Sequence, residues 1–174
     1  HDDADEKPLK ETIVVKDGKV QNVFVYISKG LEDWEPTPVS ETPVVLRQEG
    51  CIYKPHVVGI RTGQILQVTN EDGTSHNVHT VPAKNDDENK TQAAGSKPLE
   101  FVFENEEIGI KTVCDIHPWM KAYICAVDSP FFQVTGADGA FSIEGLPPGD
   151  YTLTAWHEKL KRKKALSLIH ISEP

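Results

Sequence analysis

Short runs of alternating polar and apolar residues, broken by turn signals about every ten residues, extend through most of this chain. The run KVQNVFVYI follows a turn at Asp17 and Gly18, and IGIKTVC and KAYICAV lie further along. Alternation with period two is typical of strands that bury one face, and no apolar stripe of helical period has a useful length. The pattern gives roughly seven or eight short strands up to residue 127 and predicts an all-β protein, an antiparallel Greek-key β-sandwich or barrel.

Two stretches and one proline interrupt the strand pattern. Residues 28–43 hold three prolines and several acids, and residues 82–98 hold many charges with no periodicity. Both are predicted to be loops, the second a surface loop or insertion. Pro55 lies inside an apolar run, so we expect an edge or a bend there.

The composition agrees with one domain of ordinary size and part of a second. The chain has 174 residues, of which 38% are hydrophobic and 26% are charged, with twelve glycines and twelve prolines. The 18 basic and 27 acidic residues give a formal net charge of −9. This charge argues against nucleic acid as the partner and is compatible with a solvated acidic surface or with docking to a basic protein. No apolar run approaches the ~18 residues of a membrane span, so no span is expected in this chain.

Changes in composition divide the chain into four segments. Residues 1–11 are charged and are predicted to be a flexible leader, and residues 12–128 carry the strand pattern described above. Residues 129–164 include DGAFSIEGLPPGDYTLTAWH, which resembles the carboxypeptidase-regulatory-like (transthyretin-like) modules and implies a truncated second small β-sandwich. Residues 165–174 include LSLIHISEP, which resembles a translated sequencing adapter. We therefore expect this tail to be non-native and discount His170 as a ligand.

The stretch CDIHPWM, residues 114–120, places a thiolate, an imidazole and a thioether close together. Cys114, His117 and Met120 are separated by two residues each, and a tight loop can place sulfur and ring on one side of a single ion. A second imidazole, His76 in the run SHNVH, must come from an adjacent strand. One Cys, two His and a weak Met ligand form the donor set of a blue-copper electron-transfer site.

HNVH at 76–79 and CDIHPWM at 114–120 together resemble the cupredoxins, the type 1 blue-copper family, and in particular its amicyanin-like members. The resemblance covers roughly residues 12–127 and implies one type 1 copper ion. The ligands that it implies are His76, Cys114, His117 and Met120.

The resemblance also implies roles for the residues around these ligands. The backbone amide of Asn77 would bond the cysteine sulfur and its side chain would brace the ligand loop, while Pro118 removes a backbone donor that could approach the sulfur. His117, ringed by Pro118 and Trp119, would be the exposed edge through which electrons pass.

The expected function is therefore single-electron transfer between redox proteins in the bacterial periplasm or outside the cell, without enzymatic activity. The expected partners are redox proteins such as a c-type cytochrome or a dehydrogenase. The alternative is a copper-binding or copper-delivery module, or a cell-surface interaction module, without an electron-shuttle role. The segment at 129–164 favours this alternative somewhat, because such modules usually present or tether. A thiol nucleophile at Cys114 is disfavoured, because no oxyanion device is evident in the sequence.

The other histidines and cysteines have less specific interpretations. His79 is predicted not to bind the metal, since three residues along a strand turn its ring to the face opposite His76. His56 is predicted to have a structural or surface role, and His157 is predicted not to be a ligand. If Cys114 binds metal, Cys51 and Cys125 remain, either as a disulfide in an oxidising compartment or as two buried thiols.

Overall fold

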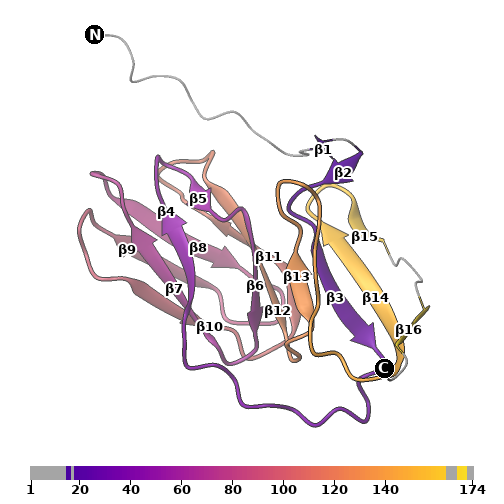
Figure 1. The fold of residues 1–174 in the computed structure, drawn as a ribbon. Coiled ribbons are helices and arrows are strands. Elements are labelled where there is room, and N and C mark those ends of the chain that lie inside the picture. Colours follow the sequence, from indigo (N-terminus) through magenta and orange to yellow (C-terminus); the bar gives the residue numbers. More distant parts are fainter. Residues whose placement is uncertain (1–14, 17, 164–167, 172–174) are drawn as a thin grey trace.

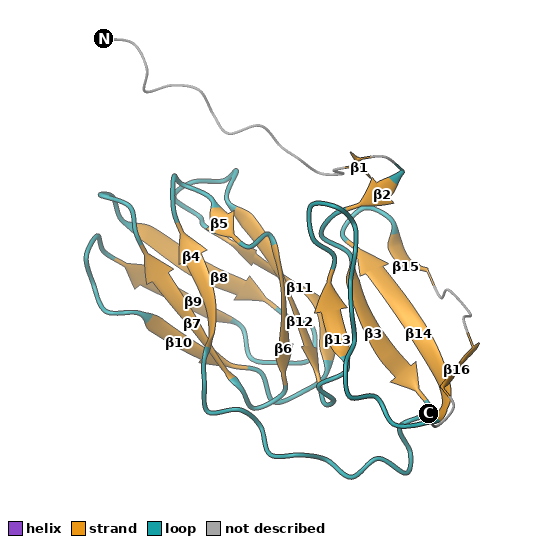
Figure 2. Ribbon diagram, in the orientation of Figure 1, coloured by secondary structure: helices purple, strands orange, loops and turns teal. Residues whose placement is uncertain are grey.

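The computed structural model describes residues 15–16, 18–163 and 168–171, and these residues form strands, turns and loops without a helix (Figures 1 and 2). The strands form three main sheets and one short hairpin. The first sheet has the order β10 (Leu99–Val102), β7 (Ile65–Asn70), β4 (Val44–Gln48) and β5 (Tyr53–Lys54). The middle sheet has the order β6 (Val57–Arg61), β12 (Lys121–Val127), β11 (Glu107–Val113), β8 (His76–Val81) and β9 (Glu88–Gln92).

The third sheet pairs β3, an early strand, with strands from the C-terminal part of the chain. Its order is β13 (Phe132–Val134), β3 (Phe24–Lys29), β14 (Gly149–His157) and β15 (Lys161–Lys163), and β16 (Leu168–Ile171) also pairs with β14. The hairpin consists of β1 (Val15–Lys16) and β2 (Lys19–Val20), on either side of the predicted turn. No helix of the length and apolarity needed to cross a membrane is found among the described residues.

The predicted all-β sandwich is confirmed, but its first and middle sheets are mixed rather than purely antiparallel. β4 runs parallel to β7, and β6 runs parallel to β12. A parallel pair cannot be joined by a tight hairpin, so the chain must cross over between the two strands. The segment from β5 to β6 makes such a crossing between sheets, and Pro55 lies in it, in agreement with the predicted bend.

The middle sheet is covered on both faces along β12. Along β12, Ile124 and Ala126 pack into a first core with the β4–β7 sheet, while Cys125 and Val127 pack into a second core with β3. This explains why the run KAYICAV is almost continuously apolar, since a strand covered on both sides has no solvent face. In Figure 1, β3 (indigo) and β14 (yellow) lie side by side beyond β6 and β12.

β3 pairs with β13 and β14, although residues 12–128 and 129–164 were expected to form separate domains. Phe24 of β3 is fully buried against Val57 and Cys125 of the middle sheet. A Cβ atom at Gly59 would lie 2.6 Å from the Phe132 ring, so the residue at 59 must be glycine for the third sheet to approach this closely. The expected second sandwich is therefore not confirmed, because its strands complete a sheet with β3.

The predicted loops have different outcomes. The segment before β4 is a long loop, as expected. The prediction of a loop over 82–98 is wrong for β9, which pairs with β8 at the edge of the middle sheet. The residues of β9 are all polar, so apolar alternation could not reveal it, and its backbone hydrogen bonds to β8 stabilise the strand instead.

The two ends of the chain lie partly outside the described residues. The predicted leader at 1–11 is outside them entirely. Of the predicted tail, β16 is described and is antiparallel to β14. The foreign origin of this tail stays a prediction, since strand pairing carries no information about origin.

Candidate metal centre

The two candidate ligand segments come from neighbouring strands of the middle sheet. β8 begins at His76, and β11, which pairs with β8, ends one residue before Cys114. Period two places His76 on the same face as Val78, and Cys114 on the same face as Ile110, so both candidate ligands face the first core. The sheet thus determines which way two of the donors point.

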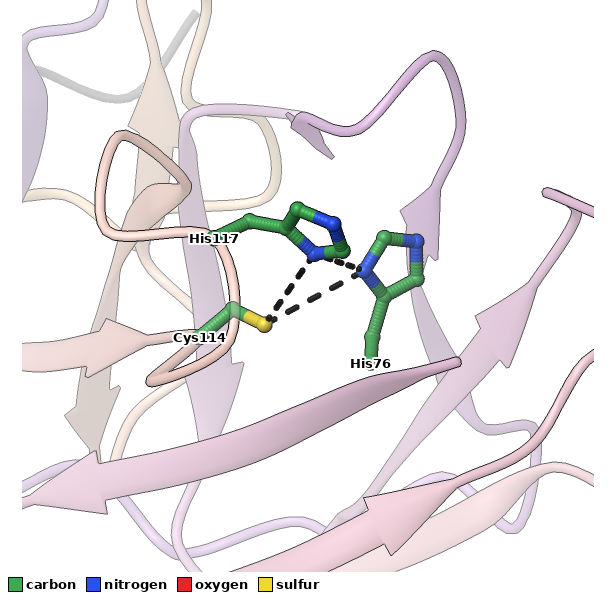
Figure 3. A group of neighbouring side chains, drawn as sticks. All are labelled: His76, Cys114 and His117. Carbon is green, nitrogen blue, oxygen red and sulfur yellow. Dashed lines mark hydrogen bonds between the residues drawn. The ribbon is translucent and has the colours of Figure 1, made fainter. Parts of the chain in front are cut away.

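The loop between β11 and β12 is closed by its own backbone. The N–H of Cys114 donates to the carbonyl of Met120 at 3.4 Å, and the N–H of Met120 donates to the carbonyl of His117 at 2.9 Å. These bonds turn the chain back on itself, so that the His117 ring lies over Cys114 (Figure 3).

Three donor atoms converge between these segments. His76 Nδ1 lies 2.9 Å from His117 Nδ1, and Cys114 Sγ lies 4.0 Å from the first and 3.7 Å from the second. Figure 3 shows the two rings and the sulfur pointing toward one another. His76 and Cys114 are buried, and His117 is half-buried. The arrangement offers a soft thiolate and two imidazoles to one ion.

The surroundings of the two rings favour donation of ring nitrogens to one ion. His76 Nε2 lies 2.9 Å from the carboxylate of Asp72, which can only accept, so Nε2 donates in this contact and Nδ1 faces His117. Burial, and then the neighbouring His76 ring, hold the pKa of His117 below its usual value. Two ring nitrogens therefore lie beside a thiol sulfur, and this donor set fits copper.

Asn77 ties the two segments together at the sulfur. Its backbone N–H donates to Cys114 Sγ at 3.5 Å, and its side-chain oxygen accepts from the N–H of Asp115 at 2.6 Å. Its amide nitrogen donates to Asp115 and to Asn89 at 2.8 and 2.7 Å. Asn89 belongs to β9, so the strand that the sequence did not reveal supports the ligand loop.

Tyr53 closes the site from the first sheet. Its hydroxyl lies 3.0 Å from the carbonyl of Asn77 and 3.1 Å from that of Val113, the residues beside two candidate ligands. Burial raises the pKa of this phenol, and the nearby Cys114 and Asp115 raise it further. Tyr53 therefore stays protonated and links the first sheet to the middle sheet beside the candidate ligands.

The remaining residues of the predicted site lie around the loop. Met120 is fully buried in the first core, in the same cluster as Cys114. Pro118 is exposed, and Trp119 is half-buried with its ring centroid 5.3 Å from that of His117. The indole N–H of Trp119 donates to the carbonyl of Cys51 at 3.0 Å.

The histidines outside the site have other partners. His79 lies near Asp115 and Asp87, at 3.2 and 3.4 Å, on the face away from His76. His56 Nε2 lies 2.9 Å from Glu158, and this contact joins the middle sheet to the end of β14. His157 is buried, and burial lowers its pKa.

The alternative of a disulfide between Cys51 and Cys125 is excluded. All three cysteines are thiols. Cys51 packs against the first core, whereas Cys125 belongs to the second core, on the other face of the middle sheet.

Three residues that support this site were missed by sequence reasoning: Asn89 of β9, described above, Asp72 and Tyr53. Asp72 lies in the turn before β8, and Tyr53 lies in a two-residue strand of another sheet. Asp72 is four residues before His76, and this spacing is the only local signal that could have pointed to it. Tyr53 gives no signal, because its contacts depend on how the two sheets pack.

No family model matches the chain, and no curated protein matches it. Among solved structures, the chain is similar to a copper-containing nitrite reductase from Thermus scotoductus SA-01, with 20% identity over 55% of this chain and a TM-score of 0.47. The match spans only 26% of the nitrite reductase.

Two smaller proteins are also similar. A purple cupredoxin from Nitrosopumilus maritimus has 22% identity over 48% of this chain and 98% of its own, with a TM-score of 0.41. The Cu(I) form of a mutant amicyanin has 16% identity over 59% of this chain and 97% of its own, with a TM-score of 0.45. All three identities are below 25%, and all three TM-scores are below 0.5.

Proposed function

We propose that this protein binds one type 1 copper ion and carries single electrons between redox proteins, without enzymatic activity. The residues that would hold the ion are His76 through Nδ1, Cys114 through Sγ and His117 through Nδ1, with the Met120 sulfur as a fourth, weak ligand. The observation that supports this most is the convergence of the two ring nitrogens and the thiol sulfur in one buried place.

The residues around the proposed ligands favour rapid electron exchange. Copper bound there would supply a one-electron couple that a thiolate and two imidazoles tolerate in both states. Asn77, Asp72 and Tyr53 hold the backbone and side chains of the donors by hydrogen bonds, which limits their movement between states. Burial of His76 and Cys114 keeps water from two of the donors.

The proposed contact surface for partners is the part of the ligand loop that reaches solvent. Pro118 is exposed beside the half-buried rings of His117 and Trp119. We propose that a redox protein such as a c-type cytochrome or a dehydrogenase docks there, in the periplasm or outside the cell.

The test is a titration of the metal-free protein with Cu(II). One equivalent is expected to give an intense blue or green thiolate-to-copper band, which reduction bleaches and reoxidation restores. A colourless complex, or preference for zinc without redox activity, would exclude the proposal. A copper complex that is not reversibly reduced and that gives up copper readily to chelators would favour the delivery module instead.

Replacing Met120 by leucine tests whether Met120 is the fourth, weak ligand. The variant is expected to keep copper and the visible band, because the three strong donors remain, and to show a changed reduction potential, because the axial ligand tunes that potential. Leu and Met have similar volumes, so the buried site should tolerate the change. Voltammetry of both proteins measures the shift. Complete loss of copper, or an unchanged reduction potential, would count against Met120 as the weak ligand.

A further inference from the structure

The turn between β4 and β5 holds the carboxylate of Asp72. The N–H of Gly50 lies 2.6 Å from one carboxylate oxygen, and the N–H of Cys51 lies 2.9 Å from the other. Both residues have positive φ, 69° and 52°, which is uncommon for a residue with a side chain such as cysteine. Successive N–H groups in a turn make a concavity that binds an anion, and here that anion is a side chain of the same protein.

The same carboxylate contacts the metal site. The oxygen that accepts from Cys51 also lies 2.9 Å from Nε2 of His76, the nitrogen on the far side of the ring from His117. The carbonyl of Cys51 accepts from the indole of Trp119, in the ligand loop. One turn therefore contacts both segments that supply the proposed ligands.

A second metal ion is the competing interpretation of this cluster. Cys51, Asp72 and His76 offer donor atoms that lie within 4.8 Å of one another. The carboxylate, however, already accepts from two N–H groups and the His76 ring, so an ion would have to break the contact with His76. Burial, and then the charges of Asp72 and Cys114, raise the pKa of the Cys51 thiol, which disfavours the thiolate that a metal needs.

We infer that Asp72, held by the Gly50–Cys51 turn, is a positioning residue that orients the His76 ring and strengthens it as a copper ligand. This inference rests on the proposed function. A carboxylate hydrogen-bonded to the far nitrogen of a ligating histidine raises its basicity, and loss of such a partner weakens metal affinity by about 10–100-fold. The negative charge also favours the more highly charged metal state, so it lowers the reduction potential.

The test compares three variants of the full chain. Asp72→Ala removes both the acceptor and the charge. Asp72→Asn can still accept from His76 with its one oxygen but lacks the charge. Glu71→Gln is the matched control, because it removes one charge at the adjacent, exposed position without a contact to His76.

Copper affinity and reduction potential are the first two readouts. Asp72→Ala is expected to bind copper about 10–100-fold more weakly in competition with a chelator. Both Asp72 variants are expected to have a higher potential than the parent, whereas Glu71→Gln is expected to match the parent. Unchanged affinity and potential in Asp72→Ala would overturn the inference.

A third readout does not need copper. In the metal-free protein, the proton on His76 Nε2 should give a slowly exchanging imidazole N–H signal by NMR, because it is buried and hydrogen-bonded. The signal is expected to persist in Glu71→Gln and to vanish in Asp72→Ala, and its persistence in Asp72→Ala would contradict the positioning role. Absence of the visible band in the parent protein would reject the proposed function, while this signal would still decide whether Asp72 orients the ring.

The number of copper ions bound per chain tests the competing interpretation, a second metal ion. The parent protein is expected to take up one copper per chain, and Cys51→Ser, which keeps both backbone groups of the turn, is expected to take up the same amount. Uptake of two ions, with loss of one in Cys51→Ser, would show that the cluster is a metal site and would overturn the inference.

Discussion

Replacing Cys114 by serine is expected to abolish the intense visible band of the copper-loaded protein and to weaken copper binding by more than about 100-fold. The band arises from charge transfer between sulfur and copper, so a hydroxyl cannot produce it. The affinity should fall further than the 10–100-fold expected for an outer partner, because a thiolate donor itself is lost. Absorption spectra and chelator competition measure the two effects.

Cys51→Ser is the control for this experiment. Cys51 also lies beside His76, but its sulfur is not among the three converging donor atoms around His117. The control is therefore expected to keep the band and the affinity. A band that survives in Cys114→Ser, or disappears in Cys51→Ser, would show that the thiolate ligand has been assigned to the wrong residue.

Replacing Phe24 by alanine is expected to lower the free energy of unfolding by about 3–5 kcal/mol. Phe24 is fully buried where the third sheet packs on the middle sheet, and its ring lies near those of Tyr26 and Phe132, with centroids 5.4 and 5.5 Å away. Its removal leaves a cavity between two sheets that cannot collapse without moving a strand. Since domains are stable by only about 5–15 kcal/mol, this loss is a large fraction of the total.

Phe141→Ala is the matched control, because Phe141 is 44% exposed. Surface substitutions of this kind usually change stability by less than about 0.5 kcal/mol. Denaturant titration followed by fluorescence or circular dichroism compares the two variants with the parent. Equal losses in both would mean that β3 and the C-terminal strands do not pack on the middle sheet as described.

The proposed ligands could be predicted because short stretches of sequence contain both the donor residues and the strand alternation that orients them. Cys114, His117 and Met120 lie in seven consecutive residues, and alternation along β8 and β11 determines which faces His76 and Cys114 occupy. The same alternation places the His79 ring on the face opposite His76, where the structure has it beside Asp115. Such predictions need only the period of a strand and the donor set that copper prefers.

The supports of the site could not be predicted in this way. Asp72 is anchored by a turn about twenty residues away in sequence, and Tyr53 bonds to carbonyls of two other strands. Asn89 belongs to a strand with no apolar residue. Each of these contacts depends on which strands pair and how the sheets pack. The identity of a single residue predicts neither the pairing nor the packing.

The amino-acid pattern alone determined that the chain forms strands, which faces are buried and which residue types could hold a metal ion. Only the tertiary structure decided that β3 joins the C-terminal strands, that Cys51 and Cys125 pack into different cores, and that two rings and a thiol meet beside Asp72. The physical reason is that a strand's period specifies its buried face but not its partner. Partners are chosen by long-range hydrogen bonding and packing over the whole chain.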